Sequence, residues 1–248
     1  MADGRIRVGI GGWTYEPWRG TFFPKGLPHA RELEHAALHV SAIEVNGTYY
    51  RLQSPDSFRK WAAAVPDDFV FTVKASRYCT NRKVLAEAGE SIDRFLGQGL
   101  TELGSKLGPI LWQFMGTKHF DAEEFAAFLA LLPGSRDGVR LRHALEVRHE
   151  SFNDPAFFEM ARRANAAVVF ADSREHPCFP EQTADFTYAR LQDAEEAEPA
   201  GYTSEALDRW AEQAKAWRDG GRDVFVFMIN GAKVRAPAAA EALMARLG

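Results

Sequence analysis

The chain has 248 residues and a mass of 27.7 kDa, with 46% hydrophobic and 26% charged residues. This composition is typical of a globular protein and excludes a wholly disordered, collagen-like or coiled-coil chain. The formal net charge of -4 argues against general nucleic-acid binding. No run reaches the roughly 18 apolar residues of a membrane helix, and the N-terminal apolar stretch is too short for a signal peptide. We therefore expect a cytoplasmic protein that is not bound to membranes, with Cys79 and Cys178 as unpaired thiols.

Eight short runs of β-branched, aromatic and other apolar residues recur along the chain and predict buried strands. They cover residues 6–10, 42–46, 69–75, 109–114, 144–148, 167–172, 186–191 and 224–230. Segments with helical spacing lie between most of these runs, at 30–40, 55–65, 91–107, 121–132 and 155–165. Ser54 and Thr203 are predicted N-caps of two helices, and Pro237 is predicted to open the last helix.

Strand–helix alternation with eight strands predicts an α/β protein, a closed (β/α)8 TIM-barrel-like fold that forms one domain over residues 1–248. The alternative is an open doubly wound sheet. The count of eight strands and the lack of a glycine-rich phosphate loop after the first strand favour the barrel. The link from Asp172 to Phe186 contains Pro177 and Pro180 and is too short for a full helix. We expect an irregular connection there, between strands six and seven.

Polar residues gather near the ends of these strands. Because side chains alternate between faces with a period of two, the polar face of each strand is predicted to point into the barrel lumen. The lumen-facing residues expected at the C-terminal mouth, where active sites of this fold lie, are Glu44, Asn46, Lys74, Gln113, Glu146, Arg148, Asp172, Arg190 and Asn230. Burying so many charges is costly, which favours a functional pocket over a purely structural lining.

The residue types suggest the chemistry of this pocket. Arginine binds phosphate and carboxylate through paired hydrogen bonds, so Lys74, Arg148 and Arg190 predict an anionic ligand. Gln113, Asn46 and Asn230 are predicted to complete the ligand-binding set. The aromatic residues after the first two strands are expected to form a wall of the pocket, and they are Trp13, Tyr15, Trp18, Tyr49 and Tyr50.

Three carboxylates are candidates for proton transfer. We predict Glu146 as a general base and Asp172 as its partner from the neighbouring strand, with Glu44 across the mouth as a reserve. The competing hypothesis is that Glu146 only orients Arg148 for ligand binding. Because the interleaved cations repel metal ions, we predict no metal site and no cofactor.

Several motifs are together similar to those of the YecE-like family, the domain of unknown function 72. The matching segments are IGGWTYEPWRGTFFPKGL at 10–27, IEVNGTYYRL at 43–52, FTVKASRYCTN at 71–81, GPILWQF at 108–114, LEVRHESF at 145–152, FADS at 170–173, YARL at 188–191 and FVFMIN at 225–230. The resemblance runs in order across nearly the whole chain. It implies a TIM-barrel-like fold and does not supply a reaction.

Three functions fit these observations. The first is a metal-independent enzyme, such as a hydrolase with carboxylate acid–base catalysis, acting on an anionic small molecule or a phosphodiester. The second is a metal-assisted hydrolase or isomerase. The third is a non-catalytic barrel that binds an anionic ligand. Metal analysis would separate the second from the first, and turnover of candidate substrates would separate the first from the third. The sequence leaves the substrate and the oligomeric state open.

Overall fold

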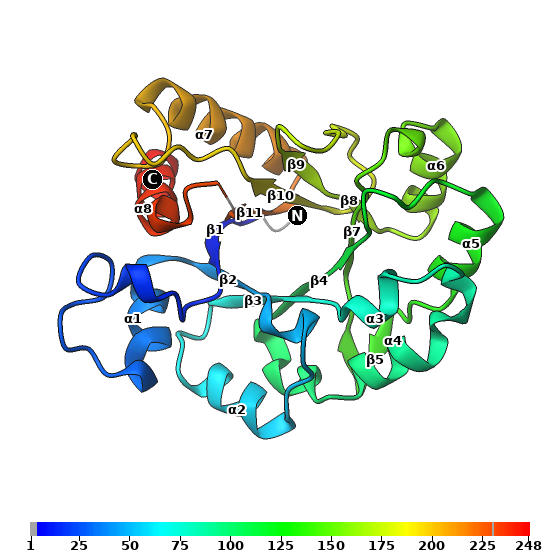
Figure 1. The fold of residues 1–248 in the computed structure, drawn as a ribbon, viewed down its shortest axis with the longest axis horizontal. Helices are drawn as coiled ribbons and strands as arrows, with labels where there is room; N and C mark the ends of the chain where they lie inside the picture. Colours follow the sequence, from blue (N-terminus) through cyan, green and yellow to red (C-terminus); the bar gives the residue numbers. More distant parts are fainter. Residues whose placement is uncertain (1–3, 230) are drawn as a thin grey trace.

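The computed structural model describes residues 4–229 and 231–248, and its parallel strands form a ring surrounded by helices (Figure 1). The apolar runs of the sequence become these strands. In chain order they are β1 (Ile6–Gly11), β2 (Ala42–Val45), β3 (Val70–Lys74), β4 (Leu107–Gln113), β7 (His143–Glu146), β8 (Ala167–Val168), β9 (Phe170–Asp172), β10 (Phe186–Leu191) and β11 (Asp223–Met228). Each of the eight predicted runs forms a strand or, at 167–172, two short ones.

One segment of the chain joins the two edges of the sheet. The strand order is β8-β7-β4-β3-β2-β1-β11-β10-β9, and all neighbours are parallel. β8 and β9 follow each other directly, separated only by Val169. β8 pairs with β7, and β9 pairs with β10 on the other side. Residues 167–172 therefore bring the edges together, which confirms the TIM-barrel-like fold and excludes the open doubly wound sheet.

Helices surround the strands, and one of them, the short helix at Arg77–Thr80, was not predicted. The helices are α1 (Glu32–His39), α2 (Pro55–Ala63), α3 (Arg77–Thr80), α4 (Gly89–Leu96), α5 (Ala122–Ala130), α6 (Pro155–Arg163), α7 (Ser204–Arg218) and α8 (Ala236–Leu247). Ser54 and Thr203 accept hydrogen bonds from backbone N–H groups of α2 and α7, as predicted for N-caps. Among the described residues, no helix has the length and apolar character needed to cross a membrane.

Two connections between strands, at 91–107 and after Asp172, can be compared with the structure predicted for them. The helix predicted over 91–107 is interrupted, because Gly99 takes a left-handed conformation with φ of 100°, and a 3-10 helix follows at Leu100–Lys106. The link from 173 to 185 contains neither helix nor strand among its residues, as expected for the irregular connection.

A short hairpin of β5 (Ser135–Arg136) and β6 (Val139–Arg140) was not predicted. Its turn is Asp137-Gly138, with both φ angles positive, a combination typical of two-residue hairpin loops.

The core has two layers, one outside and one inside the ring. The outer layer packs the strands against the helices and holds most of the phenylalanines. The inner layer fills the lumen with residues such as Leu111, Val169, Tyr188, Phe225 and Phe227. Because successive strand residues alternate between the layers, this inner set fixes which residues at each strand end point into the mouth.

Candidate functional site

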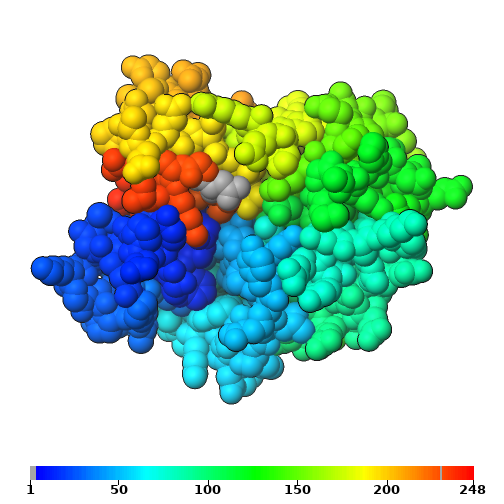
Figure 2. Space-filling view, in the orientation of Figure 1, coloured from blue at the N-terminus to red at the C-terminus, as the bar shows by residue number. Residues whose placement is uncertain are grey.

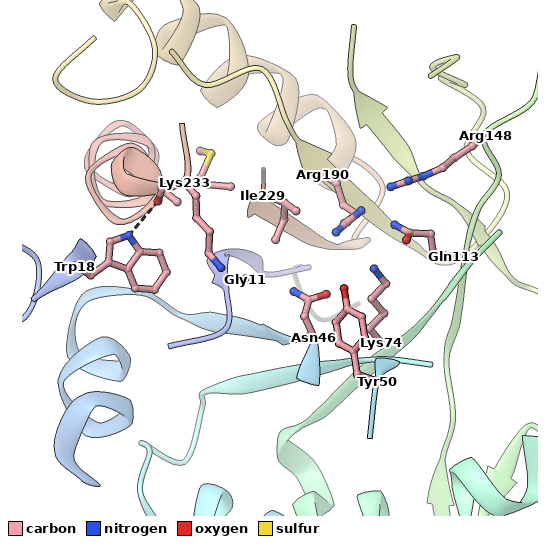
Figure 3. Close-up of a pocket in the computed structure, with 12 residues that line it drawn as sticks. Gly11, Trp18, Asn46, Tyr50, Lys74, Gln113, Arg148, Arg190, Ile229 and Lys233 are labelled. Carbon is pink, nitrogen blue, oxygen red and sulfur yellow. Dashed lines mark hydrogen bonds between the residues drawn. The ribbon is translucent and has the colours of Figure 1, made fainter. Parts of the chain in front are cut away.

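A cavity of about 350 Å³ opens at the C-terminal mouth of the barrel (Figure 3). It lies on the mouth side of the inner core layer, and Ile229 belongs to that layer and also lines the cavity. Gly11 makes room for it, since a β-carbon there would lie 2.8 Å from Ile229 and 3.1 Å from the Asn46 amide nitrogen. The lining residues are Gly11, Trp18, Asn46, Tyr50, Lys74, Gln113, Arg148, Arg190, Met228, Ile229, Lys233 and Ala236. The predicted mouth residues Asn46, Lys74, Gln113, Arg148 and Arg190 are therefore brought together.

Arg190 is the centre of the charge network beneath this cavity. Its guanidinium donates from Nε and Nη2 to the two carboxylate oxygens of Glu44, at 3.1 and 3.0 Å. Nη1 donates to Oε2 of Glu146 at 2.6 Å. The Arg190 side chain is 2% exposed, and those of Glu44 and Glu146 are 0% and 1% exposed. Buried charges at this depth are stable only when paired and hydrogen-bonded, and this geometry provides both.

Glu146 accepts hydrogen bonds at both carboxylate oxygens. Oε1 accepts from Nε of Arg148 at 2.7 Å, while Oε2 accepts from Arg190 and from the amide of Gln113 at 2.9 Å. Burial alone raises the pKa of this carboxyl, but the charges of Arg190 and Arg148, the Gln113 hydrogen bond and the Lys74 charge outweigh it and lower the pKa to about 2. Glu146 is therefore ionised across the physiological pH range, and its oxygens are occupied by protein donors.

Two residues outside the predicted site support Glu44. The Tyr188 hydroxyl donates to Oε2 of Glu44 at 2.7 Å, and the Thr72 hydroxyl lies 2.9 Å from the Tyr188 oxygen. Burial and the Glu44 charge raise the pKa of Tyr188, which stays a neutral donor. Thr72 shares its strand face with Lys74, and Tyr188 shares its face with Arg190. The period-two pattern thus contained the signal for both residues.

Lys74 lines the cavity without a carboxylate partner of its own. Its ammonium nitrogen lies 4.4 Å from the ring centroid of Tyr49, and it has no hydrogen bond or ion pair with any described residue. Burial and the neighbouring Arg190 lower the pKa of Lys74 to about 8, against the opposing charges of Glu44 and Glu146. Tyr49 is oriented by Asn81, whose amide donates to the Tyr49 hydroxyl at 2.9 Å.

Lys233 extends the positive lining to the opposite side of the cavity and was not predicted. Its ammonium nitrogen lies 4.5 Å from the Tyr15 ring centroid and 5.9 Å from that of Trp18. Trp18 Nε1 donates to the Lys233 carbonyl at 2.9 Å (Figure 3), and Figure 2 shows the N-terminal and C-terminal segments side by side. Burial lowers the pKa of Lys233. Because Lys233 begins a short 3-10 helix (Lys233–Arg235), strand alternation gives no signal for it.

The prediction that Asp172 faces the mouth beside Glu146 is wrong. Val169 belongs to the inner layer, so residues 170 and 172 point outward by alternation. Phe170 accordingly packs against Trp217 of α7, with ring centroids 5.0 Å apart. Asp172 lines a separate outer cavity with Asp193 and Tyr202, where burial and the Asp193 charge raise its pKa.

The aromatic residues divide between two environments. Tyr15, Trp18, Tyr49 and the 70% exposed Tyr50 lie at the cavity or next to its lysines. Trp13 does not line the cavity, and here the predicted aromatic wall is wrong. It packs into the outer layer against Trp61 of α2, with ring centroids 5.1 Å apart. The Trp13 ring makes more apolar contacts between the strands and the helices than it would make at the open mouth.

The remaining predictions concern Asn230 and metal ligands. Asn230 lies outside the described residues. Among the residues that the structure describes, no three His, Cys, Asp or Glu side chains are grouped so that they could hold a metal ion.

The chain is similar to proteins of one family. Residues 7–248 match the model described as protein of unknown function DUF72. The UPF0759 protein YecE of Escherichia coli K12 is 27% identical over 150 residues, which cover 59% of this chain and 50% of that protein. This chain thus spans about half the length of the curated relative it matches.

Solved structures of the same family share the fold. A DUF72 family protein from Thermotoga maritima is 25% identical with a TM-score of 0.74, covering 96% of both chains. Another from Enterococcus faecalis is 20% identical with a TM-score of 0.75, covering 98% of this chain and 95% of that one. The family match over nearly the full length and the shared barrel agree, and the chain belongs to the DUF72 family of proteins of unknown function.

Proposed function

We propose that this chain binds a small anionic molecule, bearing a carboxylate or a phosphate, in the cavity at the C-terminal mouth of its barrel. The observation that carries the proposal is the separation of charges by depth. Lys74, Arg148, Arg190 and Lys233 line the cavity, and none of its described lining residues is an aspartate or a glutamate. The balancing carboxylates, Glu44 and Glu146, lie buried behind the arginines.

The arginines keep donors for a ligand after their internal bonds are made. A guanidinium has five N–H donors, and Arg190 directs only three hydrogen bonds to Glu44 and Glu146. Arg148 contacts Glu146 through Nε and Nη2, which leaves its Nη1 without a bonding partner among the described residues. Arginine donors fixed by buried carboxylates form a preorganised anion site, because little side-chain entropy is lost when the anion binds.

The contacts of Glu146 favour a positioning role over general-base catalysis. A general base must accept a proton from the substrate, but both oxygens of this carboxylate already accept hydrogen bonds from arginines or Gln113. Asp172, its predicted partner, points to the other side of the strand. Glu146 holds Arg148 and Arg190 in place, which supports anion binding rather than carboxylate acid–base chemistry.

Thermal unfolding with increasing phosphate or oxalate tests the proposal. A ligand present at about 100 times its Kd stabilises the folded state by about 2.7 kcal/mol. Arg148→Ala should lose most of this gain, since it removes the more exposed of the two guanidinium groups, 19% exposed against 2% for Arg190, while Glu146 stays paired with Arg190 and Gln113. Arg31→Ala is the control, because Arg31 lies outside the cavity and pairs with Glu34 at 3.0 Å. Equal stabilisation of the two variants would show a nonspecific salt effect and overturn the proposal.

A further inference from the structure

Lys74 lines the cavity, and its ammonium nitrogen has no hydrogen bond or ion pair with any described residue. It ends β3 with its side chain in the mouth, close to the guanidinium of Arg190 (Figure 3). The charged groups that act on it come from three other parts of the ring: Glu44 on β2, Arg190 on β10, and Glu146 and Arg148 at the end of β7. The carboxylates are already bonded to arginines, so neither forms an ion pair with Lys74.

These surroundings raise the fraction of Lys74 that is present as the neutral amine. Desolvation and the nearby Arg190 both work against an ammonium ion, and the pKa of Lys74 falls to about 8. Roughly a tenth of the Lys74 side chains are then neutral at pH 7, about two hundredfold more than for an unperturbed lysine. Lysine that is desolvated beside another cation is a recognised form of activated nucleophile, because the free amine lone pair attacks carbonyl carbon.

We infer that Lys74 is a nucleophile that forms an imine with the carbonyl group of an anionic ketone or aldehyde bound in the mouth cavity. The inference rests on the proposed anion site and names the substrate class for it. Arg148, with its free Nη1, would hold the carboxylate or phosphate, while the carbonyl carbon meets the amine of Lys74.

The covalent step consumes one proton from solvent and releases one water molecule. The lone pair of the neutral Lys74 amine forms a C–N bond, and the carbonyl π pair moves to oxygen. That oxygen receives one proton from the attacking nitrogen, which gives a neutral carbinolamine. The hydroxyl then takes up one proton from the solvent in the open mouth and leaves as water. As its C–O bond breaks, the nitrogen lone pair forms the C=N bond. The product is a protonated iminium ion that links Nζ to the former carbonyl carbon and carries the charge of the added proton.

Reductive trapping tests the inference directly. The protein is incubated with pyruvate or dihydroxyacetone phosphate and sodium cyanoborohydride, and adducts are located by peptide mass spectrometry. The two ketones carry a carboxylate and a phosphate, so the better label identifies the anion that the site prefers. We expect Lys74 to be labelled at least about tenfold more than any surface lysine, in line with its larger neutral fraction.

Two variants make the result specific. Lys74→Arg keeps the positive charge but cannot form an imine, so it should lose the adduct while oxalate still stabilises it. Lys25→Met removes an exposed lysine outside the cavity and should keep the adduct at Lys74. A label that is spread evenly over the lysines, or absent from Lys74 while oxalate stabilises the wild type, overturns the imine and leaves the anion site standing. If oxalate and phosphate also give no stabilisation, the anion site fails as well.

Discussion

The two ends of the barrel both carry arginines paired with carboxylates, but they arrange them differently. At the mouth, Glu44 and Glu146 are fully buried and the arginines lie between them and the cavity. At the opposite end, here called the floor, Arg7, Arg142 and Asp223 gather where β1 and β11 begin. Asp223 is 34% exposed there, and Arg142 Nη1 donates to its Oδ2 at 3.0 Å.

At the floor, aromatic rings cover the guanidinium groups. The Arg142 Cζ atom lies 5.0 Å from the ring centroid of Phe225 and 5.4 Å from that of Phe186, while the Arg7 Cζ atom lies 5.7 Å from Phe225. These rings belong to the inner layer that fills the lumen. The floor arginines therefore close the barrel through stacking and a partly exposed ion pair, with their carboxylate open to water.

The comparison shows how the position of the carboxylate decides what an arginine can do. A carboxylate buried behind the guanidinium fixes its orientation and leaves donors pointing to the cavity. A carboxylate at the surface, with an aromatic ring behind the guanidinium, makes a stable cover. Sites that bind ligands need the first arrangement, because donors must be held in place before the ligand arrives.

The largest expected difference between the two ends comes from removing one arginine at each. Arg190→Met leaves Glu44 and Glu146 buried with the loss of their shared cation, which should lower the free energy of unfolding by roughly 3–5 kcal/mol. Arg142→Met breaks a partly exposed pair and two stacking contacts, and should cost about 1–2 kcal/mol. Urea denaturation measures both. Equal losses would mean that the mouth network is no more tightly coupled than the floor.

Lowering the pH should reduce the stability contributed by the mouth carboxylates more than the stability contributed by the floor ion pair. The folded-state pKa of Glu146 is lowered to about 2, so its contribution to stability is complete above the unfolded pKa and is lost as pH falls from about 5 towards 2. The loss from this one group is on the order of 3 kcal/mol. Glu146→Gln should flatten this part of the pH profile of unfolding free energy.

Asp223→Asn is the matched control at the floor. The pKa of Asp223 is also lowered, because its hydrogen bonds with the Arg5 backbone and Arg142 outweigh burial, so it too loses stabilisation in acid. Because Asp223 is one-third exposed, the flattening in this variant should be smaller than in Glu146→Gln. A larger effect for Asp223→Asn would contradict the assignment of the acid response to the mouth.

The smallest expected effect concerns the far side of the cavity. Lys233→Met removes one half-buried charge from the lining and should weaken oxalate or phosphate binding by about 1 kcal/mol, a several-fold rise in Kd. Titration calorimetry at low salt measures the change. Arg7→Met removes a floor cation far along the barrel and should leave the Kd unchanged. A similar rise in Kd for Arg7→Met would show that the net charge of the protein, not the cavity, attracts the anion.

The strand pattern made most of the mouth predictable. Residues 44, 74, 113, 146 and 190 point into the lumen because each lies an even number of positions from an apolar residue that fills the inner layer. Asp172 is expected in the lumen only because it is polar. Counting from Val169, which fills the inner layer, places Asp172 an odd number of positions away and therefore on the outer face, so the prediction was wrong. Trp13 lies in a loop, where no alternation holds and only packing decides its place.

The sequence by itself determined the fold class, the approximate position of every strand of the barrel and the gathering of Lys74, Arg148 and Arg190 at the mouth. It could do so because hydrophobic period, capping residues and strand alternation are local properties of the chain. Only the tertiary structure decided which charges neutralise each other. Arg190 and Glu44 are 146 positions apart, and Lys233 reaches the cavity from a 3-10 helix beyond the last strand. Charge pairing depends on distance in space and on burial, which barrel closure sets and a local pattern does not record.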